Sequence, residues 1–120
     1  MQYIALIYST EADDAQRSAS DMQATLQEYF AFNEAARAAG VFVAGDALQS
    51  THAATTVRVR DGERMTTDGP FAETKEQLGG YYLLECEDLD QAIEWAAKIP
   101  AAKHGSVEVR PIMLFDGAKP

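Results

Sequence analysis

The pattern of hydrophobic and polar positions along the chain marks two continuous apolar runs as central strands. Residues 2–8 are apolar on both faces of an extended segment, and residues 81–86 repeat this two-sided pattern. Strands that are apolar on both faces are usually covered on both sides. We therefore predict that these two strands lie at the centre of a sheet, with a packed layer on each face.

Apolar residues recur at helical spacing in two further segments. The first runs from about Asp21 to Ala39, with Ser20 or Asp21 as the expected N-cap and Gly40 as the stop. The predicted buried stripe of this helix is Met22, Leu26, Tyr29 or Phe30, Asn33 and Ala36. The second helix runs from Leu89 to about Ile99, capped by Asp88. Its predicted buried stripe is Leu89, Ala92, Ile93, Ala96 and Ala97.

Shorter β patterns fill the rest of the chain. Residues 41–44 and 107–112 read as strands, and Pro111 predicts that the second of these is an edge strand or carries a bulge. Residues 55–60 and 64–67 flank Asp61-Gly62, which is a strong hairpin signal. Because both faces of this hairpin are polar, we expect it at the edge of the main sheet or as an excursion from it.

The order of elements predicts one α+β domain over residues 1–120. Strand, helix, strand, hairpin, strand, helix, strand fits a ferredoxin-like split βαβ fold, an antiparallel sheet with both helices on one face. The other face of its two central strands would be bare and apolar, and such a patch usually marks an interaction surface. A second copy on a two-fold axis is the economical cover. We therefore predict a homodimer whose sheets pack face to face.

Charge and composition exclude several kinds of partner. The chain has 120 residues, 10 basic against 19 acidic, and a formal charge of −9. Nucleic acids and anionic membranes bind through Lys and Arg, so we expect neither as a partner. The apolar start at residues 3–8 is too short for a signal peptide or a membrane span. Cys86, the single cysteine, cannot form an internal disulfide. We expect a soluble cytoplasmic protein that needs no cofactor or metal.

Candidate chemistry gathers in residues 68–76, a turn rich in carboxylates that leads into the strand at residues 81–86. Asp68 and Glu73 are close in sequence to Lys75, and Arg110 is placed to hold a substrate carboxylate. Paired or buried carboxylates can act as acid or base. We treat Asp68 as a catalytic candidate and Phe71, Glu73, Lys75 and Arg110 as substrate-binding candidates. The alternative is structural: these acids and bases pair to hold the turn against the last strand.

A cavity between the first helix and the sheet is a second location for chemistry. Asn33 and Tyr81 are substrate-binding candidates there, beside Glu28 and Tyr29. For Asn33 the plainer reading is a boundary residue bonded to a nearby backbone group.

Longer stretches resemble the YCII-related family, in the branch known for its Asp-Gly-Pro-Phe motif. The resemblance covers nearly the whole chain. It rests on residues 68–76 (DGPFAETKE), 79–82 (GGYY), 92–96 (AIEWA) and 107–111 (VEVRP).

This resemblance implies a dimeric α/β-barrel. The superfamily also contains small monooxygenases, isomerases and dehalogenating or haem-dependent enzymes. Related members are often encoded beside extracytoplasmic-function sigma factors. In one branch a His on the first helix and an Asp after the second strand are the proposed catalytic pair. Here the His position falls near Glu28 and the Asp corresponds to Asp46, so both join the catalytic candidates.

Two functions follow. The first is a cofactor-independent enzyme that performs acid–base chemistry on a small organic molecule. The second is a non-catalytic module that binds a small ligand or a protein, linked to sigma-factor regulation. An enzyme should show a closed apolar cavity with a carboxylate facing in, whereas a binding module should show its acids facing outward.

Overall fold

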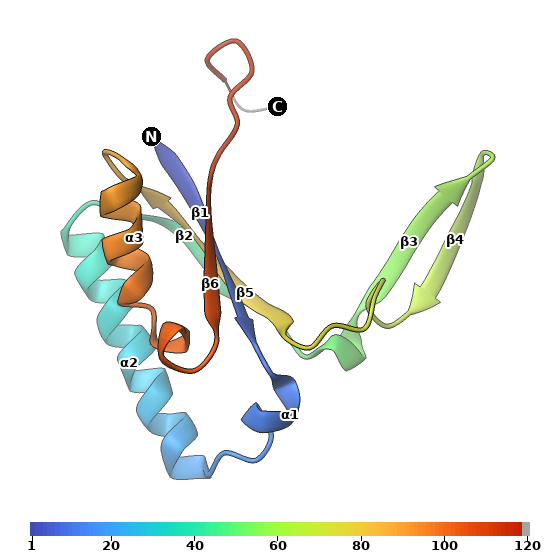
Figure 1. The fold of residues 1–120 in the computed structure, drawn as a ribbon, viewed down its shortest axis with the longest axis horizontal. Helices are drawn as coiled ribbons and strands as arrows, with labels where there is room; N and C mark the ends of the chain where they lie inside the picture. Colours follow the sequence, from blue (N-terminus) through green and yellow to red (C-terminus); the bar gives the residue numbers. More distant parts are fainter. Residues whose placement is uncertain (119–120) are drawn as a thin grey trace.

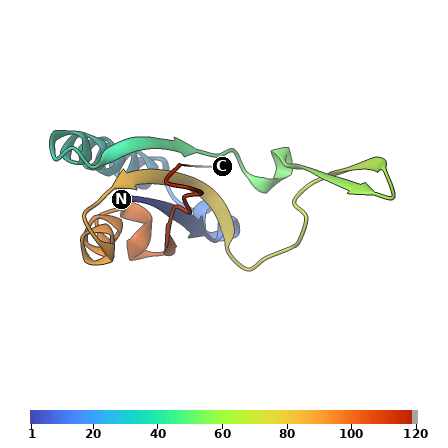
Figure 2. The same ribbon diagram turned by 90° about the horizontal axis from the view of Figure 1, so that it is seen from above.

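The computed structural model describes residues 1–118 as a four-stranded antiparallel sheet with helices on one face and a separate hairpin beyond the other (Figures 1 and 2). The strand order is β2 (Phe42–Ala47), β5 (Gln77–Glu85), β1 (Gln2–Ser9), β6 (Ser106–Pro111). Helix α2 (Ala19–Ala38) connects β1 to β2, and α3 (Leu89–Ala97) connects β5 to β6. This is the predicted ferredoxin-like fold, with β1 and β5 at its centre. The edge position of β6 also agrees with its Pro111.

Short elements complete the chain. Helix α1 (Glu11–Asp14) follows β1, and 3-10 turns occupy Thr51–Ala53 and Pro100–Lys103. The hairpin consists of β3 (Thr55–Arg60) and β4 (Glu63–Asp68), which form a separate two-stranded sheet. Of the two predicted placements, the excursion from the main sheet is the one observed. None of the helices within residues 1–118 combines the length and apolar character needed to cross a membrane.

Helix α2 begins two residues earlier than predicted. Its N-cap is Ser18, and neither Ser20 nor Asp21 caps it: the Ser18 hydroxyl accepts a hydrogen bond from the Asp21 amide at 3.1 Å. The backbone of Ser18 is extended, as an N-cap must be, whereas Ser20 already lies within the first helical turn. The predicted stop of α2 and cap of α3 are confirmed, because Gly40 follows α2 with φ +74° and the Asp88 carboxylate accepts from the Gln91 amide at 2.9 Å. Helix α3 ends at Ala97, two residues before the predicted Ile99.

Strands β2 and β5 are longer than predicted. Strand β2 continues to Ala47, and β5 starts at Gln77, so that Gly79 and Gly80 lie inside a strand. Gly80 permits a close approach of two backbones. A Cβ on Gly80 would lie 2.9 Å from the Asp46 carbonyl oxygen, so only glycine lets β2 pair closely here.

The hydrophobic core lies between the sheet and the two helices. Phe32 sits at its centre, with its ring centroid 4.8 Å from that of Tyr82 and 6.0 Å from that of Trp95. The buried core residues of the central strands and of the helices are Tyr3, Ala5, Ile7, Tyr82, Leu84, Phe32, Ala36, Ala92 and Ala96.

Both predicted helix stripes are partly wrong. On α2, Met22, Leu26 and Phe30 are about half exposed, while Phe32, which was not predicted, is buried. Leu26 and Phe30 lie on the side of α2 that lines a cavity next to the edge strand β2, whereas Phe32 packs in the core.

On α3, Ala92 and Ala96 alone are buried, whereas Leu89, Ile93 and Ala97 are exposed. Small alanines let α3 lie close to the sheet, which leaves its larger apolar side chains at the flanks.

Candidate functional site

A cavity of about 280 Å³ lies between α2 and the β2–β5 side of the sheet. This volume lies just below the range of about 300–1,000 Å³ that is typical of ligand pockets. Most of its wall is apolar or aromatic. The aliphatic and aromatic side chains of the wall are Ile7, Leu26, Tyr29, Phe30, Phe42 and Tyr82.

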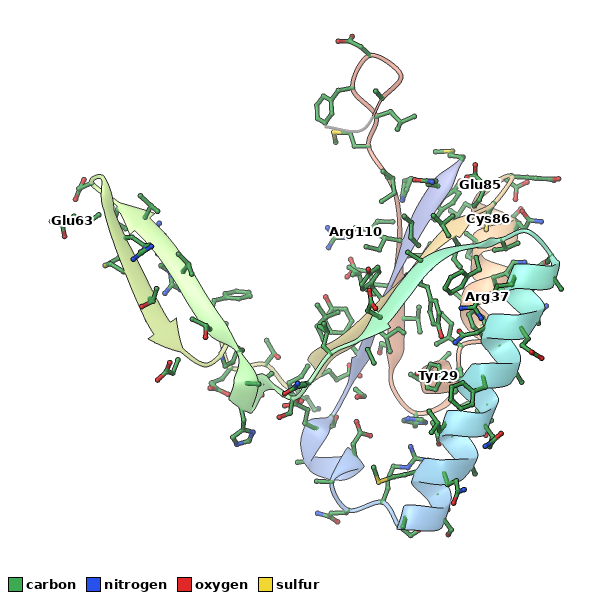
Figure 3. The ribbon with its side chains drawn as sticks, turned by 180° about the vertical axis from the view of Figure 1, so that it is seen from behind. Tyr29, Arg37, Glu63, Glu85, Cys86 and Arg110 are labelled. Atoms are coloured by element: carbon green, nitrogen blue, oxygen red, sulfur yellow. The ribbon has the colours of Figure 1, made fainter. Side chains whose placement is uncertain are left out.

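The polar groups of this cavity come mainly from one face of α2. Asn33 and Arg37 are four residues apart and therefore adjacent on the helix surface. The Tyr82 hydroxyl donates a hydrogen bond to Asn33 Oδ1 at 2.6 Å. The guanidinium carbon of Arg37 lies 4.5 Å from the centroid of the Phe42 ring, which holds this cation at the cavity wall. Figure 3 shows Tyr29 and Arg37 projecting from α2 on the side that faces the sheet.

Burial keeps the phenols of the cavity neutral. Burial raises the pKa of Tyr82 to about 12, and it also raises the pKa of Tyr29. Arg37 acts on Tyr82 in the opposite direction, which places its charge near that hydroxyl. At neutral pH the phenol of Tyr82 therefore stays protonated and is a poor general base.

The remaining hydrogen-bonding capacity of the cavity is donor-rich. Within residues 1–118 the Arg37 guanidinium has no carboxylate at salt-bridge distance. The Oδ1 atom of Asn33 is occupied by Tyr82, which leaves the N–H groups of its amide for a ligand. A cation and amide donors in an apolar enclosure are suited to the anionic group of a small molecule.

Tyr81 and Asp46 also border the cavity, but their side chains point to the opposite face of the sheet. Side chains alternate along a strand, and Tyr82 points into the core beneath the helices. Tyr81 therefore faces away from α2, where its hydroxyl donates to Asp46 Oδ2 at 2.8 Å. This bond to the carboxylate raises the pKa of Tyr81. Three predicted site residues, Asn33, Asp46 and Tyr81, thus meet at one location, from the two sides of one sheet edge.

Glu28 lies elsewhere. Its carboxylate forms a salt bridge with Lys103 at 2.6 Å, and both residues line a different surface hollow, near Trp95. Glu28 and Asp46, the pair that the family resemblance implied, do not share a cavity.

Residues 68–76 leave the hairpin and return to the sheet as an exposed loop. Asp68, Glu73 and Lys75 are all exposed, so the acids face outward. Phe71 is 76% exposed and borders a separate hollow of about 660 Å³ with Pro70, Tyr8 and Leu78. The structure does not bring these candidates to the cavity beside α2.

The proposed pairing of this loop with Arg110 is not what the structure shows. Arg110 forms a salt bridge with Glu108 of its own strand at 2.7 Å, which raises the pKa of the guanidinium. Glu76 is the acid of the loop that reaches β6, where the Ser106 hydroxyl lies 3.3 Å from its carboxylate oxygens.

Backbone bonds hold the loop at its start. The Gly69 amide donates to the Ala54 carbonyl at 2.7 Å, and the Thr56 hydroxyl donates to the Gly69 carbonyl at 2.9 Å. Gly69 has φ +96°, which other residues adopt only with strain. The Asp-Gly-Pro-Phe stretch is therefore built as a turn that leads the chain out of the hairpin.

A model of the YCII-related domain matches residues 1–116. The chain belongs to the YCII-related family. An uncharacterised protein of Rhizobium meliloti (strain 1021) is 38% identical over 117 residues, which cover 96% of this chain and 94% of that protein. The family predicted from residues 68–76 and the other motif stretches is thus confirmed. The Rhizobium protein is itself uncharacterised, so it indicates no activity for the family member described here.

Sequence reasoning missed the residues that give the cavity its charge and shape. Arg37, Phe42 and Tyr82 were not among the candidates, yet they form its cationic end. The spacing of Asn33 and Arg37 was an available signal, because residues four apart share a helix face. The stacking of Arg37 on Phe42 depends on how the chain turns after Gly40, which periodicity does not specify.

Proposed function

We propose that this protein is a homodimeric binding protein for a small organic anion with an apolar, ring-sized body. The observation that carries the proposal is the cavity beside α2, in which the cation of Arg37 and the amide of Asn33 are set in an aromatic wall. The wall would bury the body of the ligand, and the donors would bind its carboxylate. A non-catalytic sensor of this kind would suit a sigma-factor setting.

Binding is favoured over catalysis by where the acids lie. Asp68 and Glu73 are exposed on the loop, and the Asp46 carboxylate faces away from α2 toward Tyr81. The ionisable groups that face the cavity are phenols with raised pKa values and a guanidinium, none of which suits proton transfer near neutral pH.

A second candidate, acid–base turnover of the same ligand, is supported by the Tyr81–Asp46 pair at the cavity rim. If the protein is an enzyme, Asp46→Asn should abolish turnover while ligand binding persists. If it is a binding protein, no conversion of a bound ligand should be seen with either form.

The dimer part of the proposal concerns the sheet face opposite the helices, called the open face here. Cross-strand register places Leu83, Ile4 and Arg110 in one row of this face. Tyr81, Leu6 and Glu108 form the next row. The centre of the open face is thus apolar, with charges on β6 and at Asp46 on β2. A second copy is the cover that we propose for it.

Calorimetric titration with benzoate, and with benzamide as its neutral counterpart, tests the ligand proposal. We expect benzoate to bind and Arg37→Gln to weaken that binding at least tenfold, since a charge-assisted hydrogen bond contributes about 1.5–3 kcal/mol. The same variant should leave benzamide binding nearly unchanged. Lys98→Gln is the matched control, because Lys98 also stacks on an aromatic ring, 4.3 Å from the Trp95 centroid, but outside the cavity.

Equal losses in Arg37→Gln and Lys98→Gln would contradict the site. Failure of a wider set of aromatic and aliphatic carboxylates to bind would contradict an anion-binding function.

A further inference from the structure

The hairpin of residues 55–68, called the arm here, is the least enclosed part of the molecule. Every residue from Val57 to Asp68 is exposed, and Val57 and Val59 are 58% and 61% exposed. A two-stranded hairpin alone in water is marginally stable at best. The Cα radius of gyration is 16.4 Å, against roughly 14 Å for a compact domain of this length. The arm therefore costs the single chain compactness without gaining buried surface.

Hydrogen bonds at the root of the arm nevertheless hold it in place. The Glu11 carboxylate accepts from the Thr51 amide at 2.9 Å and from the Thr51 hydroxyl at 2.6 Å. The Gln77 side chain accepts from the Glu11 amide at 2.9 Å. Together with the bond between Gly69 and Ala54, these contacts fix both strands of the arm to the end of the sheet. The projection of the arm is thus a built feature.

The direction of this projection is toward the open face. Figure 2 shows the arm extending from the side of the sheet that is away from the helices, and Figure 1 shows the arm and sheet diverging from a shared root like the two sides of a V. A second protein molecule bound to the open face would therefore lie beside the arm.

Charge separates the arm from the rest of the chain. Its three arginines, Arg58, Arg60 and Arg64, are balanced by three carboxylates, so the whole formal charge of −9 lies outside the arm. The arm is thus neutral overall, and it meets no net charge repulsion from a second copy of this acidic chain.

We propose that the arm of each protomer clasps a second copy of this chain, with the sheet of that copy in the V and its outer surface against the arm. This inference rests on the proposed homodimer and adds to it a second contact. It also accounts for the arm's exposed valines and for its fixed direction.

Area supports a contact of this size. Strands about 4.8 Å apart with residues about 3.3 Å long give the four-stranded open face roughly 400 Å². Stable interfaces bury about 800 Å² of accessible surface per partner, so a larger contact than this flat outline favours a stable dimer. One face of the arm adds about 200 Å², and the surface covered by the partner's arm adds as much again. The clasp therefore about doubles the outline of the contact that each protomer offers.

The experiment combines the mass in solution with hydrogen exchange of the arm amides. The purified wild-type chain should be a dimer, and its arm amides should be protected. The double variant Val57→Asp with Val59→Asp should weaken dimerisation at least tenfold, as should Leu6→Asp on the open face. In both variants the arm amides should exchange at nearly unprotected rates. Met22→Asp is the matched control, because Met22 is 57% exposed on α2, and it should leave the dimer intact.

The outcomes separate the clasp from the dimer. A wild-type dimer with unprotected arm amides, unaffected by the valine substitutions, would overturn the clasp and leave the sheet-face dimer standing. A wild-type chain that is monomeric at every concentration would overturn both. Arm amides protected to the same degree in the Leu6→Asp monomer would show the arm packing on its own chain, which also contradicts the clasp. Circular dichroism checks the folding of the valine variants. Because both positions are exposed, the secondary structure of the rest of the chain should be unchanged.

Discussion

The body of the protein and its arm are both antiparallel β-structure, but they differ in what covers them. In β1 and β5 each strand has two neighbours and a layer of helices, and residues such as Ala5 and Leu84 are fully buried. In β3 and β4 each strand has one neighbour, and Val57 and Val59 stay exposed although β3 is richer in β-branched residues than β1 or β5. The residue pattern of a segment thus predicts that it forms a strand. Whether that strand is buried depends on which other elements pack against it.

The largest expected effect is on the free energy of unfolding when a large apolar side chain is shortened to alanine in each region. Leu84→Ala should lower the free energy of unfolding by about 2–5 kcal/mol at any protein concentration, because it leaves a void in a fully buried site. Val59→Ala in the arm should change the stability of the monomer by less than about 0.5 kcal/mol. Urea unfolding measured at several protein concentrations checks both.

Concentration dependence sharpens this comparison. If the arm is buried in a dimer, Val59→Ala should lower the apparent stability at concentrations where the dimer exists and lose this effect on dilution. A large effect of Val59→Ala on a monomeric sample would contradict the view of the arm as a part that its own chain does not cover.

Fold and site were predictable to different degrees, for reasons that can be assigned to residues. Strand periodicity and the cap at Asp88 identified the elements, because they depend on neighbours in sequence. The buried face of α2 was mispredicted, since Phe32 and Leu26 are both apolar and only the position of the helix over the sheet decides which is buried. Asn33 was found as a candidate, but Arg37 was not, because its role comes from stacking on Phe42 across the turn at Gly40. The direction of the arm depends on the bonds that Thr51, at the root of the arm, donates to Glu11, which is 40 residues away in sequence.

The second-largest effect is a loss of about 2–3 kcal/mol in the free energy of unfolding of the body at high pH. It arises from a buried tyrosine, a residue type that the arm lacks. The pKa of Tyr82 is about 12 in the folded state, against the ordinary tyrosine value of 10.0 that applies to the unfolded chain. As pH rises above 10, the unfolded chain loses this proton first, so stability is retained below pH 10 and falls progressively up to about pH 12. Unfolding in urea across this range should show the loss.

Tyr82→Phe is the variant that tests this assignment. It should flatten most of the high-pH decline, while costing about 1 kcal/mol at neutral pH through the lost bond to Asn33. Tyr81→Phe is the control on the other face of the same strand, and it should flatten the decline less. An unchanged decline in Tyr82→Phe would show that another group is responsible.

The smallest expected effect uses two glycines in the same backbone conformation, one in each region. Gly40 ends α2 with φ +74°, and Gly62 lies at the tip of the arm with φ +78°. A Cβ at either position would meet no atom within 4 Å, so alanine adds only the strain of a left-handed backbone, about 1 kcal/mol. Gly40→Ala should therefore lower the free energy of unfolding by about that amount at every protein concentration. Gly62→Ala should do so only where dimers form, because in the monomer the arm can unfold without the body. Equal losses at all concentrations would mean that the arm and the body of one chain unfold together, which the exposure of the arm argues against.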